Sequence, residues 1–422
     1  MNGSAKGAVK RLANGAAPAA RRLALTGQAS AVVFVEQMLR QAVAFGASDA
    51  HLEKYERCAR LRYRLDGVLR RIETGAFLFN EYTSVSTRIK LLAGLDIAEH
   101  RLPQDGRFSF ACEHGAADVR VSAVPLISGE RIVLRLLDSG GFDSALDRLG
   151  MGGGELALFR RALRMSQGMI LVTGPTGSGK TTTLYAALRE LNGELSGELS
   201  GEFNGEGINI LTAEDPVERR IEGINQVEVR ESIGLGFADA LRAFLRQDPE
   251  VILVGEIRDL ETADIAMKAG LTGHLVMSTL HTASVAGTIT RLVNIGLPEY
   301  LVGAALTLVV SQRLVRAICP RCREPCPAQA LPPLPPALGA AQLHHGRGCA
   351  HCHHTGHAGR RAVYEMVMMD EDLRRAVSGY SAAPAKVTQQ VNERRLCSLE
   401  EAGLKLLREG VISPAEYVRV LT

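Results

Sequence analysis

One stretch of the chain, from Gly174 to Thr181, combines the residue types that bind phosphate. It has the pattern Gly-x-x-x-x-Gly-Lys-Thr and follows the apolar run 169–172, which predicts a strand, a glycine loop and a helix. Glycines let consecutive N–H groups turn toward one anion, Lys180 adds positive charge for the β- and γ-phosphates, and the Thr181 hydroxyl suits Mg²⁺. The alternative is a glycine-rich turn without a ligand. The predicted nucleotide-binding residues are Gly174, Pro175, Thr176, Gly177, Ser178, Gly179, Lys180, Thr181 and Thr182.

Hydrolysis needs acidic residues in addition to a phosphate-binding loop, one to hold Mg²⁺ and one to orient water. Two candidates follow predicted strands: Glu214 comes after the run 209–212, and Glu256 comes after 251–254. Ligands of parallel sheets bind where the strands end, so we expect both acids at the same sheet edge as the glycine loop. Considered separately, either acid could be an ordinary loop carboxylate.

Two Cys-x-x-Cys pairs indicate a metal site near the end of the chain. They consist of Cys319 with Cys322 and Cys349 with Cys352. Four thiolates in a tetrahedral array suit structural Zn²⁺. A small, proline-rich segment that lacks a hydrophobic core would gain stability from the bound metal. Reduced free thiols are the alternative. The neighbouring histidines could compete as ligands, and they lie at positions 344, 345, 351, 353, 354 and 357.

Composition places the chain among ordinary globular proteins. It has 422 residues, of which 46% are hydrophobic and 23% charged, so we expect two or three domains. A net charge of +3 gives no support for a nucleic-acid partner. The longest apolar stretch, 301–310, is about half of what a membrane-spanning helix needs, so no such helix is expected.

The first part of the chain predicts an α+β domain over 29–138, preceded by a flexible basic tail over 1–28. Apolar periodicity predicts helices at 31–45 and 81–92, and alternation with an Asp-Gly turn predicts a hairpin over 59–69. Further strands are expected at 106–111, 118–124 and 131–137. Glycines at 139–144 suggest a linker that lets two domains rotate.

Strands then alternate with helices, which is typical of a parallel α/β sheet. We place strands at 169–173, 207–213, 251–254 and 275–279, within an ATPase domain spanning 145–318. The repeated Gly-Glu-Leu-Ser motif over 193–203 predicts an exposed loop. The tetracysteine segment follows over 319–360. A helical part over 361–422 carries capping boxes at Ser398 and Ser413.

These motifs, in this order, resemble the ATPases of type II secretion and type IV pilus assembly, over about 31–422. The resemblance rests on the glycine loop and on the segments 101–107, 214–218, 241–249, 254–259, 272–274 and 278–282. It implies a RecA-like motor domain after a PAS-like N-terminal domain, with a tetracysteine zinc insertion and a helical C-terminus. Assembly motors of this group carry the tetracysteine element and retraction motors lack it, so the resemblance favours assembly.

The resemblance also implies roles for individual residues. Glu214 would position or activate the attacking water, Glu256 would hold Mg²⁺ through water, and His281 would sense the γ-phosphate. His274 is a weaker candidate for the same sensing role, with structural capping as the alternative. Four arginines would approach the phosphates on domain closure or at a subunit boundary, with surface ion pairing as the alternative for the first two: Arg120, Arg135, Arg242 and Arg246.

The implied protein is a cytoplasmic, Mg²⁺-dependent ATPase that forms a homohexamer. It would act on an inner-membrane platform and associate with the membrane through partner proteins. Type II secretion is the favoured system and type IV pilus assembly the alternative. The residues before Ala31 are too few for the docking domain that family members often carry in addition. Two other classes remain open: a DNA-translocating motor, which needs a basic channel, and a nucleotide-gated scaffold that hardly turns over.

Overall fold

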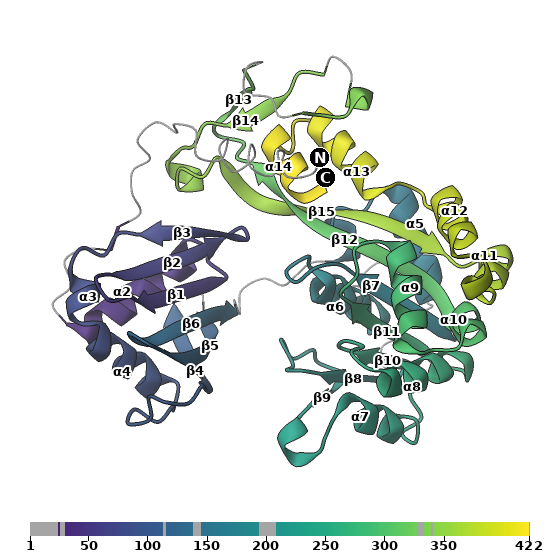
Figure 1. Cartoon of the computed structure of the whole chain (residues 1–422), viewed down its shortest axis with the longest axis horizontal. Coiled ribbons are helices and arrows are strands. Elements are labelled where there is room, and N and C mark those ends of the chain that lie inside the picture. The colour runs from purple at the N-terminus through teal and green to yellow at the C-terminus, as the bar shows by residue number, and fades with distance from the viewer. Residues whose placement is uncertain are drawn as a thin grey trace. The chain divides into compact units, whose positions relative to one another are not determined.

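The computed structural model describes residues 24–25, 30–112, 115–137, 145–193, 208–327, 333–338 and 341–421 (Figure 1). The chain divides into two compact units, each assembled from separate stretches of sequence. The predicted tail 1–28 and the repeat 193–203 lie almost entirely outside the described residues, and the linker 139–144 lies wholly outside them. None of the described helices combines the length and apolar character needed to cross a membrane.

The first unit comprises Met1–Phe142, Arg316–Leu331 and His344–Arg360. Its main sheet is antiparallel and has the strand order β3-β2-β1-β6-β5-β4. The strands are β1 Asp49–Lys54, β2 Ala59–Leu65, β3 Val68–Ile72, β4 Gln104–Cys112, β5 Gly115–Leu126 and β6 Gly129–Leu137. The helices are α2 Ala31–Ala44, α3 Phe77–Asn80 and α4 Tyr82–Leu92. A small antiparallel pair, β13 Arg323–Pro325 and β14 His344–Gly346, belongs to the tetracysteine segment.

Alternating burial along the strands builds the core of this unit. In β2, Leu61, Tyr63 and Leu65 point inward while the arginines between them stay partly exposed. These side chains pack with Phe34 of α2 and Ile89 of α4 in one hydrophobic cluster. The predicted Asp-Gly turn is present, because Asp66 and Gly67 both have positive φ, as a two-residue hairpin turn requires.

The second unit comprises Asp143–Val315, Pro332–Leu343 and Arg361–Thr422. A seven-stranded sheet with the order β15-β12-β7-β11-β10-β8-β9 organises it. The strands are β7 Gly168–Thr173, β8 Ile210–Glu214, β9 Asn225–Glu228, β10 Val251–Val254, β11 Leu275–Leu280, β12 Leu306–Ile318 and β15 His357–Met368. Every pair from β12 through β7 to β9 is parallel. This confirms the predicted α/β class.

Helices cover both faces of this sheet, because its central strands are apolar on both sides. Met169 and Leu171 of β7 join one hydrophobic cluster, and Ile170 and Val172 join another. On the first face lie α7 Phe237–Phe244, α8 Leu260–Leu271, α9 Val285–Ile295, α10 Glu299–Ala305, α11 Glu371–Val377 and α12 Pro384–Arg394. On the other lie α5 Gly153–Leu163 and α6 Lys180–Leu191. The chain ends in α13 Leu399–Arg408 and α14 Pro414–Leu421.

The sequence predictions missed three strands of this sheet. The apolar stretch 301–310 is split, because α10 ends at Ala305 and β12 begins at Leu306. Strand β15, which begins at His357, lies where the sequence predicts the end of the metal segment and a helical part. The short edge strand β9 was also not predicted. The capping box of Ser398 with Glu401 is present at the start of α13.

Candidate active site

The predicted phosphate-binding loop connects β7 to α6, and Lys180 is the first helical residue. Gly174, Gly177 and Gly179 have φ angles of 150°, 77° and 88°, a region that favours glycine. A Cβ atom on Gly174 would lie only 2.4 Å from the backbone oxygen of Gln312. The loop therefore requires glycine for both its backbone conformation and its close packing, and it ends at a helix N-terminus suited to anions.

The Lys180 ammonium lies over its own loop. Its Nζ donates hydrogen bonds to the backbone oxygens of Gly174 at 2.9 Å and Pro175 at 3.2 Å. Burial lowers the pKa of Lys180, and the negative charge of Glu256 opposes that shift. The ammonium group therefore lies against the phosphate-binding loop and is attracted by the charge of Glu256.

The sheet brings the predicted acids and His281 to one edge. Strands β7, β11, β10 and β8 are parallel neighbours in that order. Glu214 is the last residue of β8, Glu256 follows β10, and His281 follows β11. Because Leu280 pairs with Thr173, His281 aligns with the start of the phosphate-binding loop. The topology thus places all three residues at the same carboxyl edge as the loop.

Each of the two Glu256 carboxylate oxygens has a side-chain partner. Arg258 donates a hydrogen bond to Oε1, and the Nε2 atom of His281 lies 3.4 Å from Oε2. Arg258 also lies 3.4 Å from Asp215, which follows Glu214 directly. The hydrogen bond to Glu256 raises the pKa of Arg258. Arg258 was not predicted, although its place two residues after the predicted acid could have indicated a partner.

Glu214 is buried and accepts hydrogen bonds on both carboxylate oxygens. The Tyr185 hydroxyl donates to Oε2. Thr212 Oγ1 donates to Oε1 at 2.6 Å, and Gln226 Nε2 donates to the same oxygen at 3.0 Å. These three donors come from α6, β8 and β9. Sequence reasoning predicted the acid but none of the donors that fix its orientation.

Gln312 of β12 links the phosphate-binding loop to the adjacent strand. Its side chain is buried. The Oε1 atom accepts a hydrogen bond from Thr183 Oγ1 at 2.8 Å, and the Nε2 atom donates one to the backbone oxygen of Ser178 at 2.8 Å. Both ends of the amide are therefore used to hold the loop and the first turn of α6. The sequence signal was available, because a polar Ser-Gln-Arg triplet interrupts an otherwise apolar strand.

We expect Gln312→Met to weaken nucleotide binding by about tenfold, because it removes the two hydrogen bonds that hold the loop and the first turn of α6. The turnover number should fall less than the affinity. Equilibrium titration with a fluorescent ADP analogue measures the effect. Gln390→Met on α12 is the control, since the Gln390 side-chain oxygen has no partner in the described structure. Unchanged affinity in Gln312→Met would contradict the role.

Three of the predicted nucleotide-binding residues lie elsewhere in the second unit. His274 precedes β11 and is seven residues, or ~23 Å of extended strand, away from His281. Its ring Nδ1 lies 3.1 Å from the Ala269 oxygen near the end of α8, a capping contact. Arg242 pairs with Glu261, and the Arg246 guanidinium donates to the Arg242 backbone oxygen at 2.7 Å. The structure does not bring these three to the phosphate-binding loop of the same chain.

Arg120 and Arg135 belong to the first unit. They are direct cross-strand neighbours on β5 and β6. Arg135 lies 3.2 Å from Asp49, and Asp49 is also 3.3 Å from Arg64. The pair Arg120 and Arg135 thus forms part of a basic surface on this sheet, which Asp49 partly neutralises.

The four predicted metal ligands converge in the first unit. All four Sγ atoms lie within 4.8 Å of one another. The distance from Cys319 to Cys349 is 3.9 Å, and those from Cys352 to Cys322 and to Cys349 are both 3.8 Å. Tetrahedral Zn–S bonds of about 2.3 Å place sulfurs about 3.8 Å apart, so the geometry fits Zn²⁺. No histidine joins this cluster among the described residues.

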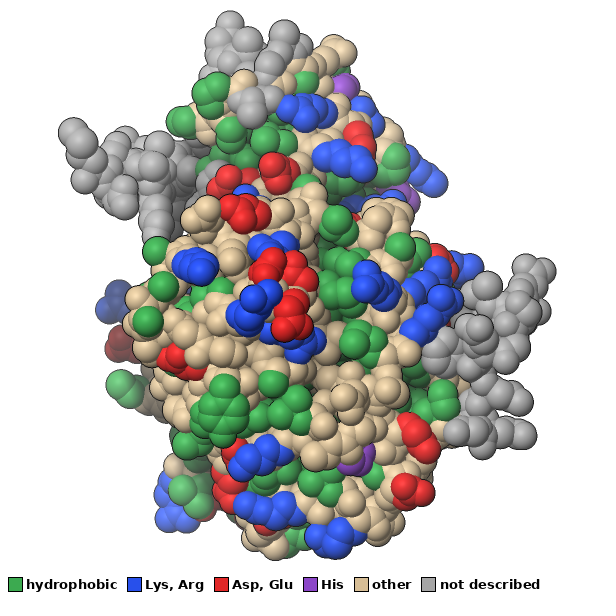
Figure 2. Space-filling model, turned by 90° about the vertical axis from the view of Figure 1, so that its right-hand side faces the viewer, with side chains coloured by type: hydrophobic (Ala, Val, Ile, Leu, Met, Phe, Trp, Pro, Cys, Tyr) green, Lys and Arg blue, Asp and Glu red, His purple; other side chains and the backbone are tan. Residues whose placement is uncertain are grey.

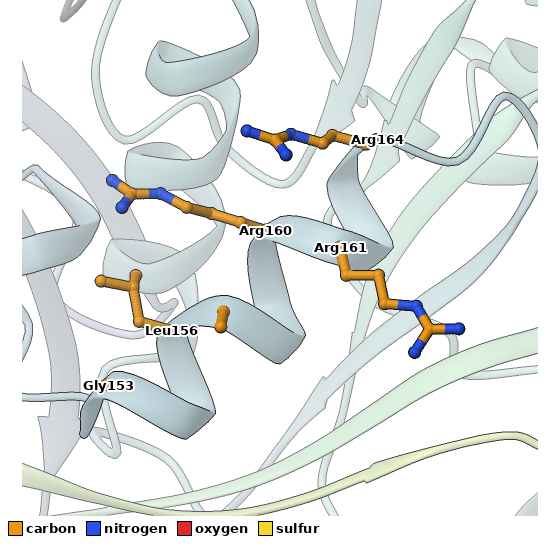
Figure 3. A pocket seen from close by; sticks show the side chains of 6 residues that line it. Gly153, Leu156, Arg160, Arg161 and Arg164 are labelled. Carbon is orange, nitrogen blue, oxygen red and sulfur yellow. The ribbon is translucent and has the colours of Figure 1, made fainter. Parts of the chain in front are cut away.

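A pocket of 390 Å³ lies away from the phosphate-binding loop, on one face of α5 (Figure 3). Its lining residues are Gly153, Leu156, Ala157, Arg160, Arg161 and Arg164. Arg160 is already paired with Asp147 at 3.0 Å and Glu190 at 2.8 Å. No predicted site residue lines the pocket, so we do not assign the nucleotide to it. On the face in Figure 2, described acidic and basic side chains are interspersed.

Comparison with known proteins gives one consistent family. Residues 24–419 match the model of the family described as type II/IV secretion system protein. The chain is 44% identical to the type IV pilus assembly ATPase PilB of Myxococcus xanthus, covering 92% of the chain and 68% of the relative. It is also 44% identical to the type II secretion system protein E of Pseudomonas aeruginosa, covering 92% and 74%. The Legionella pneumophila ATPase DotB has a similar fold, with a TM-score of 0.67, 23% identity and coverage of 94% and 98%.

Proposed function

Since the chain belongs to the type II/IV secretion system protein family, we propose that it is an ATPase motor that drives fibre assembly in a secretion or pilus system. The observation that carries this proposal is the shared sheet edge of the phosphate-binding loop, Glu214, Glu256 and His281. Type II secretion and type IV pilus assembly proteins are equally similar to the chain, so the proposal covers the activity common to both.

Each residue at the carboxyl edge of the sheet has its own role in hydrolysis. ATP phosphates bind at Gly174–Thr182, where Lys180 exchanges its two backbone oxygen partners for phosphate oxygens. Glu214, held by its three donors, orients the attacking water, and His281 senses the γ-phosphate from the neighbouring strand end. Positive charge from Lys180 stabilises the negative charge on the phosphoryl group being transferred.

Thr181 would hold Mg²⁺ through its hydroxyl and Glu256 would hold it through water, because this ion prefers hard oxygen ligands and keeps several waters. Mg²⁺ held there would neutralise charge on the β- and γ-phosphates. To hold the ion, Glu256 would give up its contacts with Arg258 and His281. Arg258 then retains Asp215 as a partner.

The motor would work as a homohexamer in the cytoplasm, attached to the inner membrane through partner proteins. Arginines from outside the edge would complete the site: Arg120 and Arg135 from the first unit, and Arg242 and Arg246 near a subunit boundary. For His274 we retain only the capping role that its contact with Ala269 supports. Hydrolysis would thereby be coupled to domain movement.

We further propose that the tetracysteine cluster binds one structural Zn²⁺ per chain. Metal analysis of protein purified without chelator should find one zinc per chain, and Cys322→Ser should lose it and unfold at lower temperature. Cys326→Ser, in the same segment but outside the cluster, should keep the zinc. Zinc-free wild-type protein, or full zinc content in Cys322→Ser, would contradict this assignment.

The proposed motor is tested by ATP turnover of the purified chain, measured together with native mass and DNA dependence. We expect phosphate release that continues for many turnovers, six chains per particle, and no stimulation by double-stranded DNA. Stimulation by DNA with a steep salt dependence would instead support a DNA-translocating motor. Release of less than one phosphate per chain would support a nucleotide-gated scaffold.

A further inference from the structure

A buried tyrosine connects the phosphate-binding helix to the proposed water-orienting acid. Tyr185 lies in α6, five residues after Lys180, and is 3% exposed. Its hydroxyl donates to Glu214 Oε2 and lies 3.3 Å from the backbone N–H of Glu218, which donates to it. One phenolic oxygen therefore contacts both ends of the loop 214–218 from the helix whose first turn faces the phosphates.

The hydrogen bonds around Glu214 leave its carboxylate little freedom. An ionised carboxylate has about four acceptor positions, and Tyr185, Thr212 and Gln226 occupy three of them. Thr212 and Gln226 both donate to Oε1, whereas Tyr185 donates to Oε2. Without the Tyr185 hydroxyl, Oε2 could turn away and the carboxylate would lose its fixed orientation.

We propose that Tyr185 is a positioning residue for hydrolysis, whose hydroxyl fixes the Glu214 carboxylate and ties its orientation to α6. This proposal rests on the function proposed above for Glu214. Orientation of the reacting groups contributes strongly to enzyme rates, and hydrogen bonds to charged groups are stronger than average. The hydroxyl makes no contact with the phosphate-binding loop in the described structure, so it should affect turnover more than nucleotide binding.

The direct test is Tyr185→Phe, which keeps the ring and removes only the hydroxyl. We expect the turnover number to fall about tenfold while the affinity for a fluorescent ADP analogue stays within about twofold. Tyr417→Phe is the matched control, because Tyr417 is also buried in this unit and its hydroxyl has no partner in the described structure. Thr212→Val, which removes a donor to Oε1 in a strand that favours valine, provides a second variant with the same expected direction.

A double-mutant cycle with Glu214→Gln separates positioning from a general structural role. Rates are taken from single-turnover phosphate release from radiolabelled ATP, which measures slow residual hydrolysis. We expect Tyr185→Phe to add no further loss when Glu214 is already glutamine, because the hydroxyl acts through that acid.

Each other outcome is informative. Wild-type turnover in Glu214→Gln would overturn the function proposed for the acid. A slow Glu214→Gln with wild-type turnover in Tyr185→Phe and Thr212→Val would overturn the positioning role alone. An equal loss from Tyr185→Phe in both backgrounds, or a loss of affinity at constant turnover, would show that the hydroxyl only supports the fold.

Discussion

Lys180→Ala is expected to lower ATP turnover by at least about 100-fold without unfolding the protein. The wild-type ammonium donates to the oxygens of Gly174 and Pro175 and lies in the field of Glu256, so it is already at the phosphate-binding loop before nucleotide arrives. Alanine removes the charge that stabilises the transferring phosphoryl group and leaves the first turn of α6 helical. Multiple-turnover phosphate release measures the effect.

The control for this variant is Lys268→Ala. Lys268 is an exposed lysine on α8, where it pairs with Asp264 at 2.6 Å. Its removal changes net charge by the same amount and should leave turnover unchanged. Wild-type turnover in Lys180→Ala, with normal thermal unfolding, would show that the nucleotide does not bind at this loop.

Glu256→Gln is expected to lower turnover by about 100-fold and to raise the Mg²⁺ concentration needed for half-maximal rate. The substitution keeps the size of the side chain and its capacity to accept from Arg258, but it removes the negative charge that would hold the cation. Glu393→Gln, on the exposed surface of α12, is the control for the loss of one carboxylate. An unchanged rate and an unchanged Mg²⁺ requirement would together exclude Glu256 as the metal-holding acid.

The parts of the fold that local pattern determines were predicted well. Positive φ angles are readily adopted by glycine and by few other residues, mainly Asn and Asp, so the loop after β7 and the hairpin turn at Asp66 could be predicted from short motifs. Strand β12 could not, because a continuous apolar run has no periodicity that separates helix from strand. The residues from Leu306 onward are extended because β12 pairs with β7 in the sheet, and not because their own sequence favours a strand.

The site was predictable where it depends on strand ends and unpredictable where it depends on side-chain partners. Glu256 and His281 follow apolar strands, so a parallel sheet had to bring them to one edge. The same reasoning could have placed His274 at the opposite edge, because it precedes its strand. Tyr185 has no sequence motif, and only its hydrogen bond from α6 to Glu214 of β8 makes it a partner of the site. Gln312 is marked only by the polar triplet in its apolar strand, which does not show that it contacts Thr183 of α6.

The central claim is that one sheet edge combines a phosphate-binding loop with acids that hydrolyse ATP. It is tested most directly by multiple-turnover phosphate release from the wild-type chain and Glu214→Gln, each with its ATP affinity measured in parallel. The account predicts many phosphates released per wild-type chain, and a loss of about 100-fold in Glu214→Gln with ATP affinity retained. Equal rates in the two proteins, or less than one phosphate per wild-type chain, would contradict it.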